Sequence, residues 1–149
     1  MKRWAWVVVA LIAAVLGGYR GWQRLQASWT LKAVEVRSNA YLQRGQARPA
    51  DLMANARALE RAAEQDPANV AVKIFQGSQY LLLGRAPKAI TLYKQALALE
   101  PRAEIHLNLG LAYRLQKNLE LAREHFAQAM KLDPRLAEQV PREFGGSKP

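Results

Sequence analysis

Apolar and polar residues follow two successive patterns near the start of the chain, and both predict α-helix. Residues 4–19 form an apolar run without charged side chains. These sixteen residues, at 1.5 Å each, span about 24 Å, somewhat less than the ~30 Å hydrocarbon core of a bilayer. Trp22, Leu25 and Trp29 then recur at helical spacing, and residues 20–46 contain no proline. We therefore expect the apolar helix to continue into the next helix of the chain.

The apolar run is typical of a membrane anchor. Aromatic and basic residues flank it at both ends, an arrangement that suits membrane interfaces. They are Arg3, Trp4 and Trp6 on one side and Tyr19, Arg20 and Trp22 on the other. We expect a single transmembrane helix over residues 1–22. The alternative for this run is a cleaved signal peptide, because Met1-Lys2-Arg3 precedes it. For the stripe of Trp22, Leu25 and Trp29 that follows, the alternative is an amphipathic helix at the membrane surface.

The positive charge is concentrated near this segment. Residues 1–50 hold eight Lys or Arg and one Glu, a net +7 of the chain's +10. A nucleic-acid-binding protein usually carries such an excess on its folded module. Basic residues beside an apolar segment instead favour a surface of anionic lipid. We therefore expect a membrane and no nucleic acid as partner. The composition, rich in Ala, Leu, Arg and Gln, favours a bacterial inner membrane. The short charged N-terminus before an apolar run favours repeats in the periplasm, whereas the count of flanking charges favours the cytoplasmic side.

The second half of the chain repeats itself with a period of 33–34 residues. Asp66-Pro67, Glu100-Pro101 and Asp133-Pro134 are spaced 34 and 33 residues apart. Two copies match position by position over small, aromatic and proline residues. The first has Gly77, Tyr80, Ala89, Tyr93, Ala96 and Pro101, and the second has Gly110, Tyr113, Ala122, Phe126, Ala129 and Pro134. Small residues let two helices cross closely, and the prolines end each pair of helices.

These positions resemble the tetratricopeptide repeat (TPR), a helix–turn–helix unit of about 34 residues. The resemblance implies an all-α solenoid with two clear repeats, at 70–102 and 103–134. A degenerate copy precedes them, with its first helix near 34–46 and its second at 51–69; Asn55 and Gln43 replace the usual small residues there. The remaining ranges are the anchor at 1–22, a juxtamembrane helix within 23–50, and a cap and tail at 135–149.

The C-terminal cap is expected to be short. Leu136, Val140 and Phe144 recur every four residues, as a capping helix requires, but Pro141 interrupts them. A poorly covered end would leave apolar surface, so self-association through this end is one hypothesis.

The TPR resemblance implies a concave groove lined by the first helix of each repeat, which would bind a protein or peptide segment. Its expected lining combines apolar residues with an arginine: Ile74, Ser78, Leu81, Leu82, Leu107, Leu111, Arg114 and Leu115. The degenerate repeat would add Arg37, Ala40, Arg44 and Arg48. The lysine and asparagine pattern of chaperone-tail clamps is not matched at the corresponding positions.

Catalytic and cofactor motifs do not occur in the sequence. It has no cysteine, no glycine-rich phosphate loop and no metal-ligand spacing, and His106 and His125 fall on different helices. We therefore expect no enzyme, cofactor or metal. The sequence favours a membrane-anchored adaptor in an envelope assembly of the secretion, pilus or polysaccharide-export type. Alternatives are a holdase-like quality-control factor at the membrane and a self-assembling structural oligomer.

Overall fold

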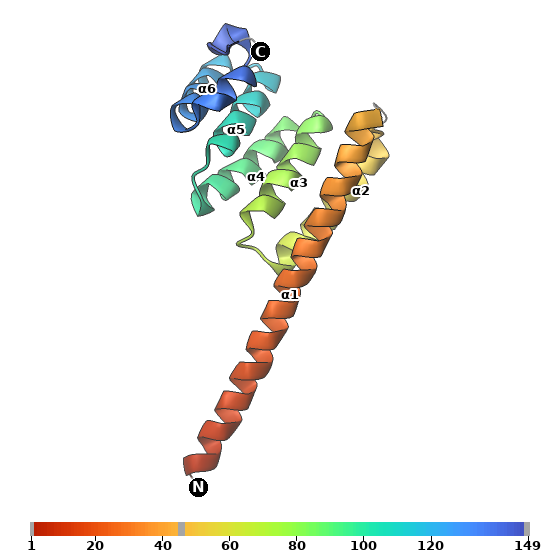
Figure 1. Cartoon of the computed structure of the whole chain (residues 1–149), viewed down its shortest axis with the longest axis vertical. Helices are drawn as coiled ribbons and strands as arrows, with labels where there is room; N and C mark the ends of the chain where they lie inside the picture. Colours follow the sequence, from red (N-terminus) through yellow and green to blue (C-terminus); the bar gives the residue numbers. More distant parts are fainter. Residues whose placement is uncertain (1, 45–46, 148–149) are drawn as a thin grey trace.

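Six α-helices arranged as three antiparallel pairs form the described part of the molecule (Figure 1). The computed structural model describes residues 2–44 and 47–147, with only the backbone of residues 2–6, 42 and 44. Helix α1 pairs with α2, α3 with α4, and α5 with α6, and two 3-10 turns follow the last pair. Their bounds are α1 Lys2–Arg44, α2 Pro49–Gln65, α3 Val70–Leu82, α4 Ala86–Leu99, α5 Ala103–Leu115, α6 Leu119–Leu132, η1 Pro134–Glu138 and η2 Arg142–Phe144. The expected all-α helical repeat is confirmed.

Local sequence explains where these helices begin. The side-chain oxygens of Asn69 and Asn118 accept hydrogen bonds from the amides of Val72 (3.1 Å) and Leu121 (3.2 Å), and so cap α3 and α6. Helices α2 and α4 have proline in their first turn, where its fixed φ angle is favourable and its missing N–H is not needed.

Small residues bring the helices of each clear pair into contact. A Cβ atom placed on Gly77 would lie 2.6 Å from the Tyr93 ring, and one on Gly110 would lie 2.6 Å from the Phe126 ring. Both rings are fully buried. The crossing inferred from glycine and aromatic spacing is therefore confirmed in both repeats.

Helix α1 extends the first pair well beyond its expected limits. Its C-terminal half packs on α2 and α3 through the buried Ala27 and Val34, so the helix of this pair begins before residue 34. The single helix confirms the expected continuity from the apolar run into the first repeat. Asn55, which departs from the repeat pattern, is buried and donates a hydrogen bond to Ser38 Oγ at 3.3 Å. Gln79 Nε2 donates to the same oxygen at 3.4 Å.

The N-terminal half of α1 projects from the helical stack (Figure 1). Within residues 2–44 and 47–147, no helix combines the length and the apolar character that a membrane crossing needs. The transmembrane helix expected over 1–22 is thus not found, because the apolar run is short and Arg20, Gln23 and Arg24 follow it in the same helix. The side chains of Trp4 and Trp6, expected at one membrane interface, lie outside the described residues.

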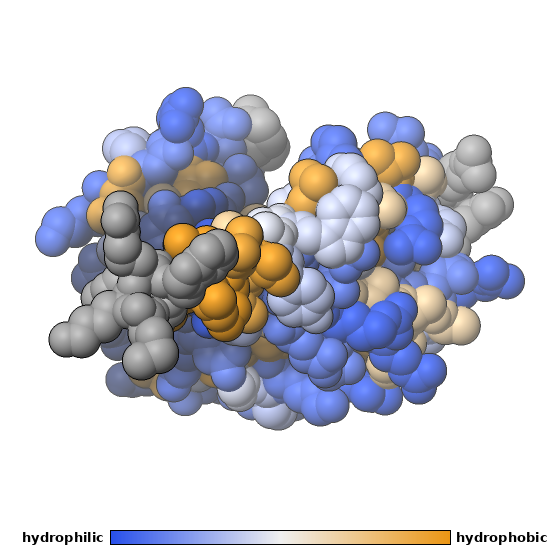
Figure 2. Space-filling view, turned by 90° about the horizontal axis from the view of Figure 1, so that it is seen from below, coloured by the Kyte–Doolittle hydropathy of each residue, from blue (hydrophilic) through white to orange (hydrophobic). Residues whose placement is uncertain are grey.

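The projecting part of α1 nevertheless exposes apolar surface. Seen from its N-terminal end, hydrophobic residues gather on this helix while the surface around it is mostly hydrophilic (Figure 2). Val7, Leu11 and Val15 are each more than half exposed. Nothing in the described part of the chain covers them.

The C-terminal residues cap the last pair with two 3-10 turns instead of a helix. Val140 is 3% and Phe144 6% exposed, and the Phe144 ring lies 5.0 Å from that of Phe126. The expected short cap is therefore present, and Pro141 separates its two turns. Leu119 (55%) and Leu132 (54%) of α6 remain exposed beside it, so self-association through this end stays a hypothesis.

Candidate groove on the first helices

The first helices of the three pairs lie side by side. Helix α3 contacts both α1 and α5, so their free faces form a common surface. At the C-terminal ends of α3 and α5, this surface holds an open cavity of about 470 Å³. Its lining residues are apolar or positively charged: Leu81, Leu111, Arg114, Leu115 and Lys117.

Four of the eight expected groove residues thus line one cavity. Leu81 and Leu111 are half-buried, whereas Leu115 is 49% exposed. Leu82, next to Leu81 in the chain, is 52% exposed. A ligand can reach these side chains without moving the helices.

Three of the other expected residues, Ile74, Ser78 and Leu107, serve packing. Ile74 is 8% and Leu107 6% exposed, and both belong to the main hydrophobic core. The Ser78 hydroxyl donates to the Ile74 carbonyl oxygen at 3.0 Å and lies 3.2 Å from the Tyr93 hydroxyl. Burial raises the pKa of Tyr93 to about 12. These residues support the groove from beneath and offer a partner little surface.

Lys117 is a lining residue that sequence reasoning missed. It lies in the α5–α6 turn with φ of 61°, in the left-handed region. Its counterpart one repeat earlier is Gly84, with φ of 71°. The 33-residue period could have identified the turn position, but it could not show that the lysine faces the cavity.

Two positively charged side chains line the cavity together with its leucines. Arg114 and Lys117 lie three residues apart at its edge. The Arg114 Nε atom is 3.6 Å from the Glu143 carboxylate of the C-terminal cap, and both side chains are about half exposed. Such an exposed pair contributes little to stability, so a ligand carboxylate can compete with Glu143.

Of the arginines expected from the degenerate repeat, Arg48 lies outside the first helix of its pair. Arg48 precedes α2, and its Nε atom donates to Asp51 at 2.9 Å. That hydrogen bond lowers the pKa of Asp51. Arg37 is exposed and donates to the Ala33 carbonyl oxygen, and the side chain of Arg44 lies outside the described residues. The interpretation of Arg48 as a groove residue was wrong, because α2 begins at Pro49.

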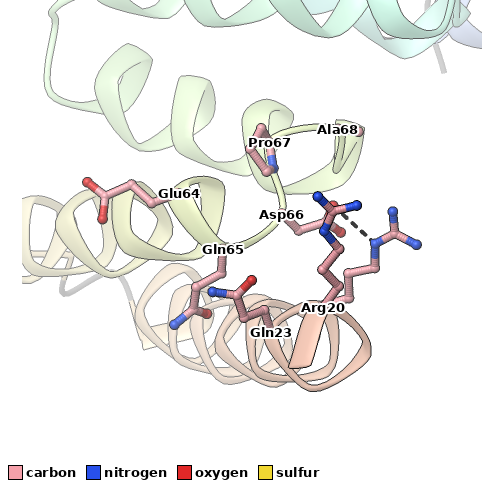
Figure 3. Close-up of a pocket in the computed structure, with 8 residues that line it drawn as sticks. Arg20, Gln23, Glu64, Gln65, Asp66, Pro67 and Ala68 are labelled. Atoms are coloured by element: carbon pink, nitrogen blue, oxygen red, sulfur yellow. Dashed lines mark ion pairs between the residues drawn. The ribbon is translucent and has the colours of Figure 1, made fainter. Parts of the chain in front are cut away.

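A second cavity, of about 320 Å³, lies where α1 passes the turn between α2 and α3 (Figure 3). Asp66 points toward the arginine side chains of α1, and its carboxylate is 3.9 Å from Arg24 Nε. Gln65 donates to Gln26 at 3.4 Å. Charges of both signs line this cavity and partly pair with each other, so it is a polar contact beside the buried Ala27 and Val34 that hold α1 on α2 and α3.

Comparison with known families assigns this fold. The tetratricopeptide-repeat family model matches residues 37–101 and 76–137, well over half of the chain. The chain belongs to the tetratricopeptide-repeat family. Its function class is therefore that of a TPR scaffold for protein–protein interaction, a fold without catalytic activity. The resemblance inferred from glycine, tyrosine, alanine and proline spacing is confirmed.

Several solved structures resemble this one. A structure named MamA MSR-1 C2 is 29% identical, with a TM-score of 0.57, and the match covers 70% of this TPR chain and 58% of that one. The first TPR of Spaghetti (RPAP3), bound to the HSP90 peptide SRMEEVD, is 18% identical with a TM-score of 0.63, covering 78% and 94%. The TPR protein TTC0263 of Thermus thermophilus is 23% identical with a TM-score of 0.56, covering 91% and 66%. The last two show the fold alone. No curated protein is significantly similar in sequence.

The two histidines of the last TPR meet between α5 and α6. Their Nδ1 atoms are 3.0 Å apart, and His125 stacks on Tyr113 with ring centroids 5.4 Å apart. Burial lowers the pKa of both imidazoles, and so favours the neutral pair that shares one proton in a hydrogen bond. No group of three potential metal ligands occurs in the described residues. The pair therefore acts as a packing element of the repeat.

Proposed function

We propose that this TPR protein binds a peptide segment that carries apolar side chains next to acidic ones. The observation that carries the proposal is the cavity lined by Leu81, Leu111 and Leu115 with Arg114 and Lys117 at its edge. Leucine and isoleucine side chains of a peptide would gain by burial there, and nearby carboxylates would pair with the two cations. The peptide complex of RPAP3, which shares the fold, is consistent with this use of the scaffold.

Peptide selection from a random library tests this function. Selected peptides should combine Leu, Ile or Phe with Asp or Glu, and their affinity should fall with rising salt. Leu115→Glu, an exposed position, should weaken binding by tenfold or more, and Leu111→Glu should abolish it. Leu132→Glu is the matched control, because Leu132 is similarly exposed (54%) on α6, outside the cavity. Equal binding by the Leu115 and Leu132 variants would show that this cavity is not the peptide-binding site.

We further propose that the protein works at a bacterial inner membrane, with its repeats in the periplasm, as an adaptor in an envelope assembly. Two observations support this proposal: the uncovered apolar side chains on the N-terminal half of α1, and the net +7 of residues 1–50. Apolar surface of this size on a projecting helix needs a cover, and anionic lipid attracts the adjoining basic residues. Flotation with membranes, followed by protease digestion from the periplasmic side, tests both parts. A chain that stays in the soluble fraction, or repeats digested only after lysis, would contradict it.

A further inference from the structure

Helix α1 carries an exposed stripe with heptad spacing along most of its length. Its members follow one another at alternating intervals of three and four residues. They are Val8, Leu11, Val15, Gly18, Trp22, Leu25, Trp29, Lys32 and Val36. A repeat of 3.5 residues keeps such a stripe facing a partner helix over many turns, as in coiled coils. We call these nine residues the α1 seam.

Every member of the α1 seam is exposed. Its seven large apolar side chains are between 43% and 71% exposed. The rings of Trp22 and Trp29 contact each other edge to face, with centroids 5.9 Å apart, and both remain more than half exposed. A Cβ atom placed on Gly18 would meet nothing within 4 Å. Lys32, the charged member, already pairs with Glu35 at 2.9 Å.

The α1 seam lies on the side of α1 opposite the TPR domain. The face that packs on α2 and α3 holds Ala27, Val34 and Ser38, all buried. These residues are displaced from Trp22 and Trp29 by about half a turn of an α-helix. A partner helix can therefore dock on the seam without disturbing the repeats.

We propose that α1 pairs with α1 of a second copy, in parallel and in register, along the α1 seam. Heptad spacing selects a helix as the partner, and a parallel two-fold arrangement stacks each seam residue on its own copy. At on the order of 100 Å² for each large side chain, seven residues would bury about 700 Å² per helix, close to the ~800 Å² per partner of a stable interface. This dimer is independent of the peptide groove.

A lipid surface is the alternative to a second helix as the cover of the α1 seam. Beyond residue 21, the position of the seam beside the domain argues against lipid. At the level of Trp22, Trp29 and Val36, the other side of α1 is packed against the domain. A bilayer covering these residues would have to accept the polar surface of the neighbouring helices as well, which is unfavourable. A second α1 helix would cover the seam residues without contacting the polar surface of the neighbouring helices.

Disulfide trapping in the chain, which lacks cysteine, tests the proposal. In mild detergent, Val36→Cys should form a disulfide-linked dimer rapidly, because the same residue of both copies meets in a parallel pair. Arg20→Cys is the matched control: it is exposed on α1 but faces away from the seam. We expect at least a tenfold faster linkage for Val36→Cys. Equal rates for the two variants would overturn the proposal.

Mass measurement by light scattering gives a second, independent readout. The unmodified protein in detergent should have the mass of two chains, and Trp29→Glu should reduce it to one while leaving helicity unchanged. Leu132→Glu, a substitution of similar exposure on α6, should stay dimeric. A single-chain mass for the unmodified protein would overturn the dimer. Quenching of Trp22 and Trp29 by brominated lipid would then assign the seam to lipid.

Discussion

Substitution of Gly110 by alanine tests how closely α5 and α6 approach. The new Cβ atom would lie 2.6 Å from two ring atoms of Phe126 and 2.9 Å from Cγ. Ordinary contact begins at 3.4 Å, so the ring would have to retreat by about 0.8 Å. Phe126 is fully buried and Phe144 packs on it at 5.0 Å, so the ring has little room to move.

Two opposing effects decide the sign of the change in stability. Alanine is a better helix former than glycine by about 1 kcal/mol in a helix interior. Overpacking a filled core costs about 1–3 kcal/mol. Because the contact involves ring atoms near the fixed end of the side chain, we expect the cost to dominate. The free energy of unfolding should fall by about 1–2 kcal/mol.

Urea unfolding followed by circular dichroism at 222 nm measures this loss. Gly21→Ala is the matched control, because nothing lies within 4 Å of its Cβ position, and it should leave the domain's stability unchanged or slightly higher. In a Phe126→Leu background, the penalty of Gly110→Ala should shrink by about 1 kcal/mol, since the ring edge is gone. If the Gly110→Ala protein were at least as stable as the parent, the contact between residue 110 and the Phe126 ring would not limit stability, and this prediction would be refuted.

Four further changes probe other parts of the molecule. The lowered pKa of His106 and His125 means that stability is fully present above about pH 6.5 and is lost as pH falls through the folded-state pKa values; His125→Gln should flatten this loss in urea midpoints. Ser38→Ala leaves two buried amide donors without their acceptor and should cost about 2 kcal/mol in thermal or urea unfolding. Phe144→Ala should cost about 3 kcal/mol and raise hydrogen exchange first in α6, whereas unchanged exchange would show that the cap contributes nothing. Lys117→Gly should raise stability by about 1 kcal/mol by relieving its left-handed conformation, while weakening binding of acidic peptides in calorimetry.

The parts of the fold that follow from close packing were predictable from sequence. Gly77 and Gly110 leave no room for a side chain, so their spacing to the aromatic rings had to recur in each repeat. The first pair was harder to place from sequence, because the buried Asn55 stands where the repeat pattern has a small residue. Its side-chain amide is accommodated by a hydrogen bond to Ser38. Such a partner, 17 residues away, leaves no repeat signature.

The groove was predictable in outline and not in detail. Repeat positions identify which helix faces the groove, but they do not separate Leu107, which fills the core, from Leu115, which remains available. That difference depends on how far along each helix the neighbouring pair extends. The meeting of His106 and His125 likewise depends on their level in two antiparallel helices, which spacing along the chain does not give.

Helix α1 links the two proposals physically. Its packing face places the buried Ala27 and Val34 against α2 and α3, and this contact fixes its direction relative to the repeats. A helix held so firmly transmits the orientation of its N-terminal half to the domain. If two copies pair along the α1 seam, the two grooves are therefore held at a defined separation, because Trp22 lies in the same continuous helix that packs on α3. A partner with two binding segments would then gain affinity from simultaneous engagement, without any additional contact in either groove.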